Sequence, residues 1–218
     1  MNESDSLDSF LDKWRARWPE WELLSVFVPA PQRGTVAAWL TLLQELGDAA
    51  WAGADPTPGL AKLAWWQEEL LGWSKGARRH PLGQALQRLA APWDTLGRAL
   101  AALPATRTAG EGDGREAIER FGAAVLACEA ALFGGATPDA TAIAAVAADL
   151  QATRSLVQGE SGAAVAPPTP PAGGLSRPRR LQQVALRARL SQRARGQAQA
   201  RPASLGLLLS GWRAARRG

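Results

Sequence analysis

Three carboxylates stand in helical segments where they could bind a metal or move a proton: Glu45, Asp48 and Asp149. Mg²⁺ prefers hard oxygen ligands in octahedral geometry, and carboxylates three or four residues apart share one helix face. Glu45 and Asp48 have this spacing, so they are the best candidate metal ligands, and with Asp149 they are the candidate catalytic acids. The alternative for an isolated acid on a helix is a solvated side chain.

Neither aspartate has an acidic partner one helical turn away. Gln44 precedes Asp48 by four residues, and Asp149 has Ala145 and Thr153 at the corresponding positions. Neither position can therefore form a pair of carboxylates spaced by four residues.

His80 and Cys128 are the only histidine and the only cysteine. His80 could serve as a general base, but no acid is close to it in sequence. Pro81 behind it marks a helix boundary, so a structural role at a helix start is the favoured interpretation. A single cysteine excludes an internal disulfide and a cysteine-based metal cluster. No glycine-rich phosphate loop occurs.

Apolar residues recur every three or four positions through most of the chain, which predicts helices. The clearest pattern covers residues 60–73, with Leu60, Leu63, Trp66, Leu70 and Trp73 on one face. Other helices are expected over 7–18, 22–28, 35–51, 80–103 (bent or broken near Pro92), 115–133 and 138–156. We predict one all-α domain over residues 1–218, a bundle of about seven or eight helices.

The end of the chain is basic and begins with a linker. Residues 159–178 are rich in proline, glycine and alanine, which predicts a flexible linker before two basic helices over 179–195 and 202–217. No acid follows Glu160, whereas the last 58 residues hold eleven arginines. Such a segment suits nucleic acid, anionic lipid or an acidic surface of the same molecule. Nucleic acid is the weakest option, because only Trp212 interleaves the arginines.

The order of these segments resembles the phytoene/squalene synthase family, the head-to-head trans-isoprenoid synthases. The most specific part is 60–71, with its Trp65-Trp66 pair, followed by His80-Pro81. Residues 23–33, 36–46, 120–135 with 144–156, and 200–205 also resemble successive segments of the family. The resemblance covers roughly residues 10–218 and implies a single bundle of the isoprenoid synthase type.

Enzymes of this family bind two isoprenoid diphosphates through Mg²⁺ ions held by two motifs of paired aspartates. The first motif falls here on Glu45 and Asp48, and the second on Asp149, so both pairs are missing. The resemblance therefore implies a fold that is kept and a metal-dependent chemistry that is lost. No cofactor is expected, and Mg²⁺ is expected only if prenyltransferase activity persists. Related proteins without the aspartates include assembly factors of mitochondrial respiratory complex I.

Four residues are candidates for a ligand cavity: Trp39, Trp65, Trp66 and Arg154. Aromatic side chains suit an isoprenoid or another lipid, and arginines in this family meet diphosphates. For Trp65 and Trp66, packing in the core is the favoured alternative.

The favoured hypothesis is a squalene/phytoene-synthase-like helical protein that is catalytically inactive and acts as a binding or assembly factor. One alternative is an active Mg²⁺-dependent prenyltransferase of squalene or phytoene biosynthesis. Another is a peripheral membrane or respiratory-complex assembly helper, which docks on an anionic membrane or a protein partner through the Arg-rich C-terminal segment. Leu181, Val184, Ala185 and Ala188 share one face of that segment, between arginines.

The first ten residues are acidic and polar and do not form a secretory signal. No apolar run is long enough to span a bilayer. We therefore expect a cytoplasmic protein, with peripheral contact at the inner membrane face as an option.

Overall fold

The computed structural model describes residues 3–107, 113–135, 137–159, 174–196 and 204–216, and every regular element among them is helical. This confirms the all-α prediction. The α-helices are α1 (Glu3–Arg17), α2 (Trp21–Leu24), α3 (Arg33–Trp51), α4 (Thr57–Trp73), α5 (Leu82–Leu86), α6 (Trp93–Ala99), α7 (Asp113–Phe133), α8 (Ala140–Val157), α9 (Arg177–Ala194) and α10 (Ser204–Arg216). Short 3₁₀ helices are η1 (Ser25–Phe27), η2 (Ala30–Gln32) and η3 (Leu100–Thr106).

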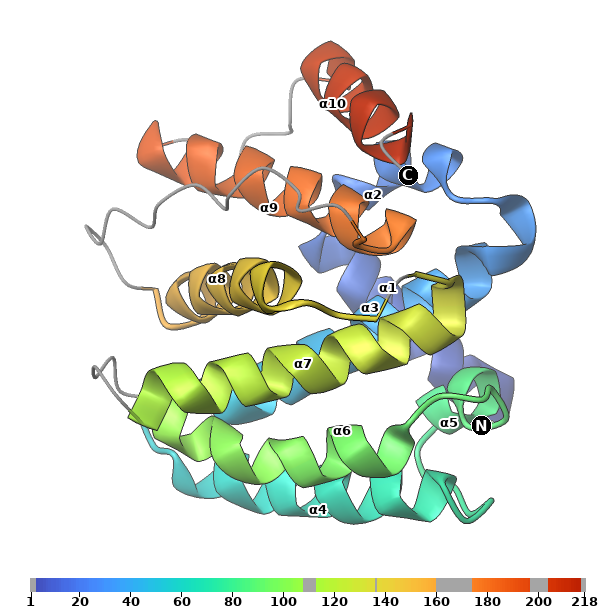
Figure 1. Ribbon diagram of the computed structural model, residues 1–218, viewed down its shortest axis with the longest axis vertical. Coiled ribbons are helices and arrows are strands. Elements are labelled where there is room, and N and C mark those ends of the chain that lie inside the picture. The colour runs from blue at the N-terminus through green and yellow to red at the C-terminus, as the bar shows by residue number, and fades with distance from the viewer. Residues whose placement is uncertain (1–2, 108–112, 136, 160–173, 197–203, 217–218) are drawn as a thin grey trace.

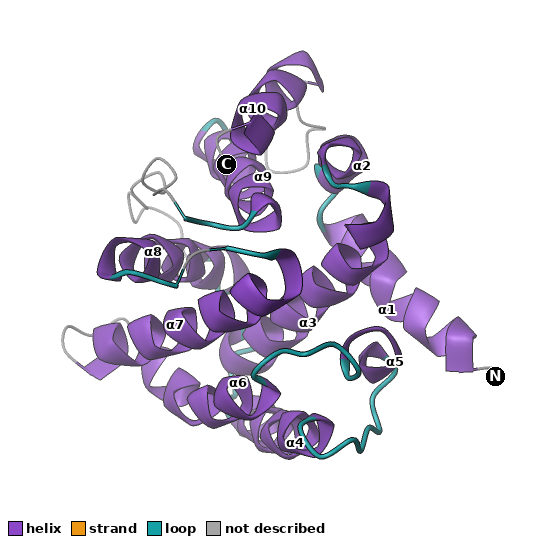
Figure 2. Ribbon diagram, turned by 45° about the vertical axis from the view of Figure 1, so that its right-hand side comes forward, coloured by secondary structure: helices purple, strands orange, loops and turns teal. Residues whose placement is uncertain are grey.

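The long helices are stacked in layers. In Figure 1, α4 lies lowest, with α6, α7, α8 and α9 above it and α10 at the top. Helix α3 passes behind α7 and contacts α1, α4, α5 and α8, so it ties the stack together. Figure 2 shows α1 and α2 on one side of α3, and α7 and α8 on the other.

The apolar stripe of α4 faces the core as predicted. Trp66 and Trp73 are fully buried, and Leu63 and Leu70 lie beside them in the core. Leu60, in the first turn, is the exception and is 45% exposed. The fully buried indole rings make α4 a central packing element, because aromatic side chains bury the largest apolar surfaces.

The break expected near Pro92 within residues 80–103 is confirmed, although the region is divided further than one broken helix. The chain forms α5, then α6 and then η3, and α6 begins directly after Pro92. Proline lacks the backbone N–H that a helix interior needs, so a helix cannot continue through Pro92. Pro104, within η3, is compatible with the short 3₁₀ segment that ends this region.

The expected linker ends before residue 178, because α9 begins at Arg177. Residues 160–173 lie outside the described residues. Leu175 is buried, and the Ser176 hydroxyl accepts a hydrogen bond from the backbone N–H of Arg179 at 3.2 Å, which caps α9. Arg177 and Pro178 already belong to α9, so the boundary at 178 is wrong.

The basic helix α9 lies inside the molecule and meets acids from the front of the chain. Arg179 pairs with Glu129 of α7, and Arg189 pairs with Glu20, Nη2 to Oε2 2.7 Å. These arginines confirm the third option for the basic segment, an acidic surface of the same molecule. The face of α9 with Leu181, Val184 and Ala185 is buried in the core, so the idea that this face meets a membrane is wrong.

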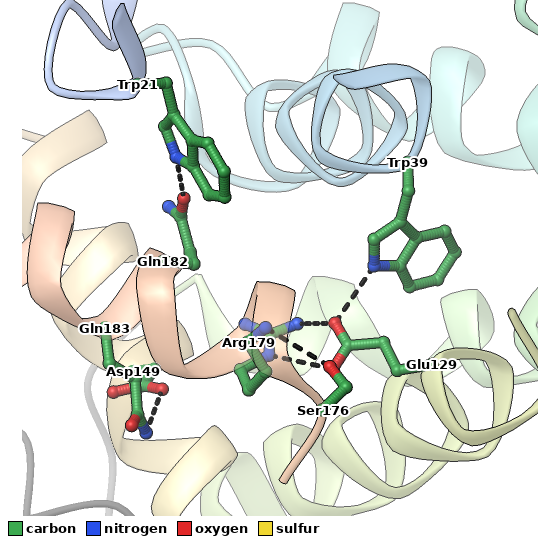
Figure 3. A network of polar contacts seen from close by, with 8 residues as sticks. All are labelled: Trp21, Trp39, Glu129, Asp149, Ser176, Arg179, Gln182 and Gln183. Carbon is green, nitrogen blue, oxygen red and sulfur yellow. Dashed lines mark hydrogen bonds and ion pairs between the residues drawn. The ribbon is translucent and has the colours of Figure 1, made fainter. Parts of the chain in front are cut away.

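Glu129 is the centre of a buried polar network that joins three helices (Figure 3). Its carboxylate accepts hydrogen bonds from Trp39 Nε1 of α3 at 2.9 Å and from Arg179 Nε of α9 at 3.1 Å. The Ser176 hydroxyl donates to it at 3.3 Å. A buried charge is tolerated only with such partners, so the network specifies how α3, α7 and α9 meet.

We predict that Glu129→Gln destabilises the fold by about 3–5 kcal/mol, because it removes the hydrogen-bonded counter-charge of the buried Arg179 guanidinium. Guanidinium unfolding followed by circular dichroism measures the loss. The control is Glu116→Gln on the same helix, where the side chain is 74% exposed and the expected loss is below about 0.5 kcal/mol. Equal losses in the two variants would refute the central role of Glu129.

Candidate functional site

A cavity of about 220 Å³ lies between α1, α3, α8 and α9, with Phe121 of α7 in its wall. Its apolar wall includes Trp14, Trp18, Trp51, Phe121, Leu150 and Leu186. Its polar lining includes Arg17, Gln44, Asp48, Asp149, Arg179 and Arg189. The cavity thus joins a mainly aromatic and aliphatic interior to a few convergent polar groups, which is the usual composition of a small-molecule site.

Asp48 and Glu45 share one end of α3, but each carboxylate already has a cation. Arg17 of α1 donates from Nη1 to both oxygens of Asp48, at 3.0 and 2.9 Å. Lys62 of α4 bonds Glu45 Oε2 at 2.7 Å. Burial raises the pKa of Asp48 in spite of the neighbouring Arg17. Asp48 lines the cavity, whereas Glu45 does not.

Asp149 of α8 is the most unusual polar group of the cavity. Its side chain is buried, and Gln183 of α9 donates to Oδ2 at 2.9 Å (Figure 3). Burial raises the pKa of Asp149 to about 6, against the opposing effect of Arg179. Its Oδ1 meets no hydrogen-bond donor among the described residues, and the same is true of the buried Oε1 of Gln44.

Buried acceptors without a donor are rare in folded proteins, so these two oxygens need an explanation. Both belong to side chains that line the cavity. A bound group that donates hydrogen bonds would satisfy Asp149 and Gln44. A carboxyl with a raised pKa inside a cavity is also a common mark of a functional site.

Three of the arginines that line the cavity are paired with acids. Arg17 pairs with Asp48, Arg179 with Glu129, and Arg189 with Glu20. Arg189 also stacks on Trp18, with the guanidinium carbon 4.0 Å from the ring centre. Arg193 of α9 also lines the cavity, so the lining carries four arginines and the two aspartates Asp48 and Asp149.

The four predicted cavity residues do not line this cavity. Trp39 donates a hydrogen bond from Nε1 to Glu129, and Arg154 donates one to the carbonyl of Thr106 at 3.0 Å. Trp66 is fully buried, and Trp65 packs against it edge to face, with ring centres 5.2 Å apart. Trp66 therefore belongs to the core, and Trp65 is partly buried and packs against it.

The aromatic side chains that do line the cavity are Trp14, Trp18, Trp51 and Phe121. Trp14 lies in α1 and Trp18 directly follows it, and their spacing of four residues is helical. Nothing in that pattern says which helices this face meets, so the spacing alone does not place them in a site.

His80 has a structural role at a helix start. Its Nδ1 accepts the backbone N–H of Leu82 at 3.1 Å, and its ring packs against Trp66 and Phe10. Burial lowers the pKa of His80 to about 4, so the ring is neutral at pH 7. This agrees with the favoured interpretation.

Glu69 of α4 was missed by the sequence analysis. It is buried and accepts the backbone N–H groups of Arg79 and His80, at 2.7 and 2.8 Å, and Trp73 Nε1 at 2.8 Å. These bonds fix the loop between α4 and α5. They lower the pKa of Glu69 against the cost of burial.

The carboxylates do not fit a magnesium site of the family type. Asp48 is clamped by Arg17, Glu45 is bonded to Lys62, and Asp149 stands alone on α8. Among the residues that the structure describes, no three acids, histidines or cysteines gather closely enough to hold a metal ion. Mg²⁺ needs several oxygen ligands placed octahedrally, which this donor set does not offer.

No family model, curated protein or solved structure matches the chain. The resemblance to the phytoene/squalene synthases therefore stays a prediction.

We predict that Asp149 lowers stability as the pH rises. An unfolded carboxyl titrates near pH 4, whereas Asp149 in the fold titrates near 6. The folded state therefore holds the proton more tightly, and stability falls between about pH 4 and pH 6 by about 3 kcal/mol. Asp149→Asn cannot ionise, so it should be more stable than the wild type at pH 7 and lose that advantage near pH 4.

Urea unfolding at several pH values measures this difference. Asp12→Asn, at a carboxylate that is 70% exposed, is the control and should show no such pH-dependent gap. A gap between Asp149→Asn and the wild type that stays constant from pH 4 to pH 7 would contradict the prediction.

Proposed function

We propose that this chain is an isoprenoid-synthase-like helical protein that binds a single apolar ligand, such as an isoprenoid chain, without metal-dependent prenyl transfer. The observation that carries the proposal is the cavity of about 220 Å³, with its tryptophan-rich wall and its unsatisfied acceptors on Asp149 and Gln44.

The size of the cavity supports one ligand. An apolar cavity of about 150 Å³ holds one benzene ring, and pockets for drug-sized ligands measure about 300–1,000 Å³. A volume of about 220 Å³ lies between these values, so it admits part of one chain. Head-to-head condensation requires two prenyl chains side by side, which exceed this space.

The polar lining supports an uncharged end group. Asp149 Oδ1 and Gln44 Oε1 are acceptors, so either one matches a hydroxyl group, which donates one hydrogen bond. A diphosphate would face the carboxylates of Asp48 and Asp149. Three of the four arginines in the lining, Arg17, Arg179 and Arg189, are already paired with acids. We therefore favour a prenyl alcohol over a prenyl diphosphate.

A second candidate function is prenyl transfer itself. The observation in its favour is that Asp48 of α3 and Asp149 of α8 line the same cavity, from two helices in contact. If these aspartates hold Mg²⁺ during turnover, Asp48→Ala and Asp149→Ala abolish the activity.

We expect farnesol to bind more tightly than farnesyl diphosphate, with or without Mg²⁺, and no squalene-type product to form. Isothermal titration calorimetry measures both affinities, and product extraction after incubation with farnesyl diphosphate and Mg²⁺ measures turnover. Tighter binding of the diphosphate would contradict the proposed ligand. Turnover that Asp48→Ala abolishes would establish the second candidate.

We also expect Leu43→Trp to weaken farnesol binding by roughly tenfold or more, because the larger ring fills space that the ligand needs. Leu43 is half-buried and lines the cavity. The matched control is Leu60→Trp on α4, at an exposed position outside the cavity wall. Undiminished affinity in Leu43→Trp would show that farnesol does not occupy this cavity.

A further inference from the structure

Helix α10 attaches to the rest of the molecule by one face. Leu207, Gly211 and Ala214 form that inner face and are buried. Gly211 sits so close to its neighbours that an added Cβ would lie 2.7 Å from Leu24 Cδ2 and 2.8 Å from Phe27 Cε2. The guanidinium of Arg180 also donates to the carbonyl of Ala214, at 2.8 Å. These contacts determine which side of α10 faces outward.

The outer face of α10 carries an apolar stripe. Leu205, Leu209 and Trp212 are 76%, 49% and 47% exposed, and their spacing of four and three residues places them in one row. Val26 of η1, an element that contacts α10, is 56% exposed. The other large exposed apolar side chain among the described residues is Leu60 of α4, at the opposite end of the stack (Figure 1).

The stripe is flanked by positive charge. Arg213 and Arg216 are exposed, and the Arg216 guanidinium lies 4.7 Å from the ring centre of Trp212. The exposed acid on the elements packed against α10 is Glu22 of α2. No acid follows Glu160 in the sequence. Leucine and tryptophan beside arginine is the composition of helices that lie in the interface of an anionic membrane.

We propose that the outer face of α10 docks on the surface of an anionic lipid bilayer. Leu205, Leu209 and Trp212 enter the boundary between headgroups and acyl chains, while Arg213 and Arg216 meet lipid phosphates. A second copy of the chain is a poorer partner for this face. A two-fold contact would place Arg213 and Arg216 of one copy near the same arginines of the other, and like charges repel.

In this docked position α10 lies parallel to the membrane surface, and the rest of the bundle stays outside the bilayer. No helix among the described residues is long and apolar enough to cross a membrane. A short interfacial helix gives weak and reversible binding, which depends on both the apolar stripe and the charges. The inference is independent of the cavity, although α10 packs directly on α9, which forms part of the cavity wall.

Vesicle flotation tests the proposal. We expect the wild type to float with vesicles of phosphatidylcholine and phosphatidylglycerol, less with phosphatidylcholine alone, and less again at high salt. The variant Leu205→Ser/Leu209→Ser/Trp212→Ser should lower the partition coefficient by roughly tenfold or more on anionic vesicles. Arg213→Gln/Arg216→Gln should lower it by about tenfold on anionic vesicles and leave neutral vesicles unchanged.

Leu60→Ser is the matched control, since it removes an exposed leucine at the other end of the molecule and should leave flotation unchanged. A second measurement uses a conservative substitution. Brominated lipid should quench the tryptophan fluorescence of the wild type more than that of Trp212→Phe. Three results would overturn the proposal: no flotation of the wild type, full flotation of the triple serine variant, or a concentration-dependent dimer that the serine variant loses while lipid binding is absent.

Discussion

The ion pair between Glu129 and Arg179 is the constraint on which the arrangement of the bundle depends. Both side chains are almost completely buried, so each charge would carry a large desolvation cost if it met no partner. Trp39 and Ser176 complete the hydrogen bonding of the carboxylate. Because these partners come from α3 and from the start of α9, the pair aligns α3, α7 and α9. The cavity lies along α3 and α9, and its shape follows from that alignment.

Helical periodicity alone predicted α3, α4, α7 and α8 nearly to their ends. Over residues 80–103 the break at Pro92 was expected from the sequence, whereas the division of the region into the short helices α5 and α6 and the segment η3 was not. Charge asymmetry left three kinds of partner open for the basic segment, and one of them, acids of the same molecule, pairs with Arg179 and Arg189 of α9. The apolar pattern did not identify Glu69 or Glu129 as buried acids, since a charged residue within a helix is expected to face solvent. Depth in the core depends on which helices meet, and this contact information is absent from local spacing.

The candidate site shows the same limit. Asp48 and Asp149 were selected from the sequence and do line one cavity, yet the tryptophans beside them are not the predicted ones. The Trp65-Trp66 pair, the most specific part of the family resemblance, packs against His80 and the core. Its role is architectural: it supports the loop that Glu69 fixes. The chemistry of the cavity therefore rests on residues from α1, α3, α8 and α9, helices far apart in the sequence.

Helix α9 supplies the partners of three buried acids, which matters while the chain is being synthesised. Glu20, Glu129 and Asp149 precede α9 in the sequence, and each takes a partner from it: Arg189, Arg179 or Gln183. During synthesis these acids leave the ribosome before their partners do, and domains form as their segments emerge. Before α9 is made, these carboxylates lack the partners that it supplies, and burying them would carry a large desolvation cost. The final packing of the three acids therefore requires α9.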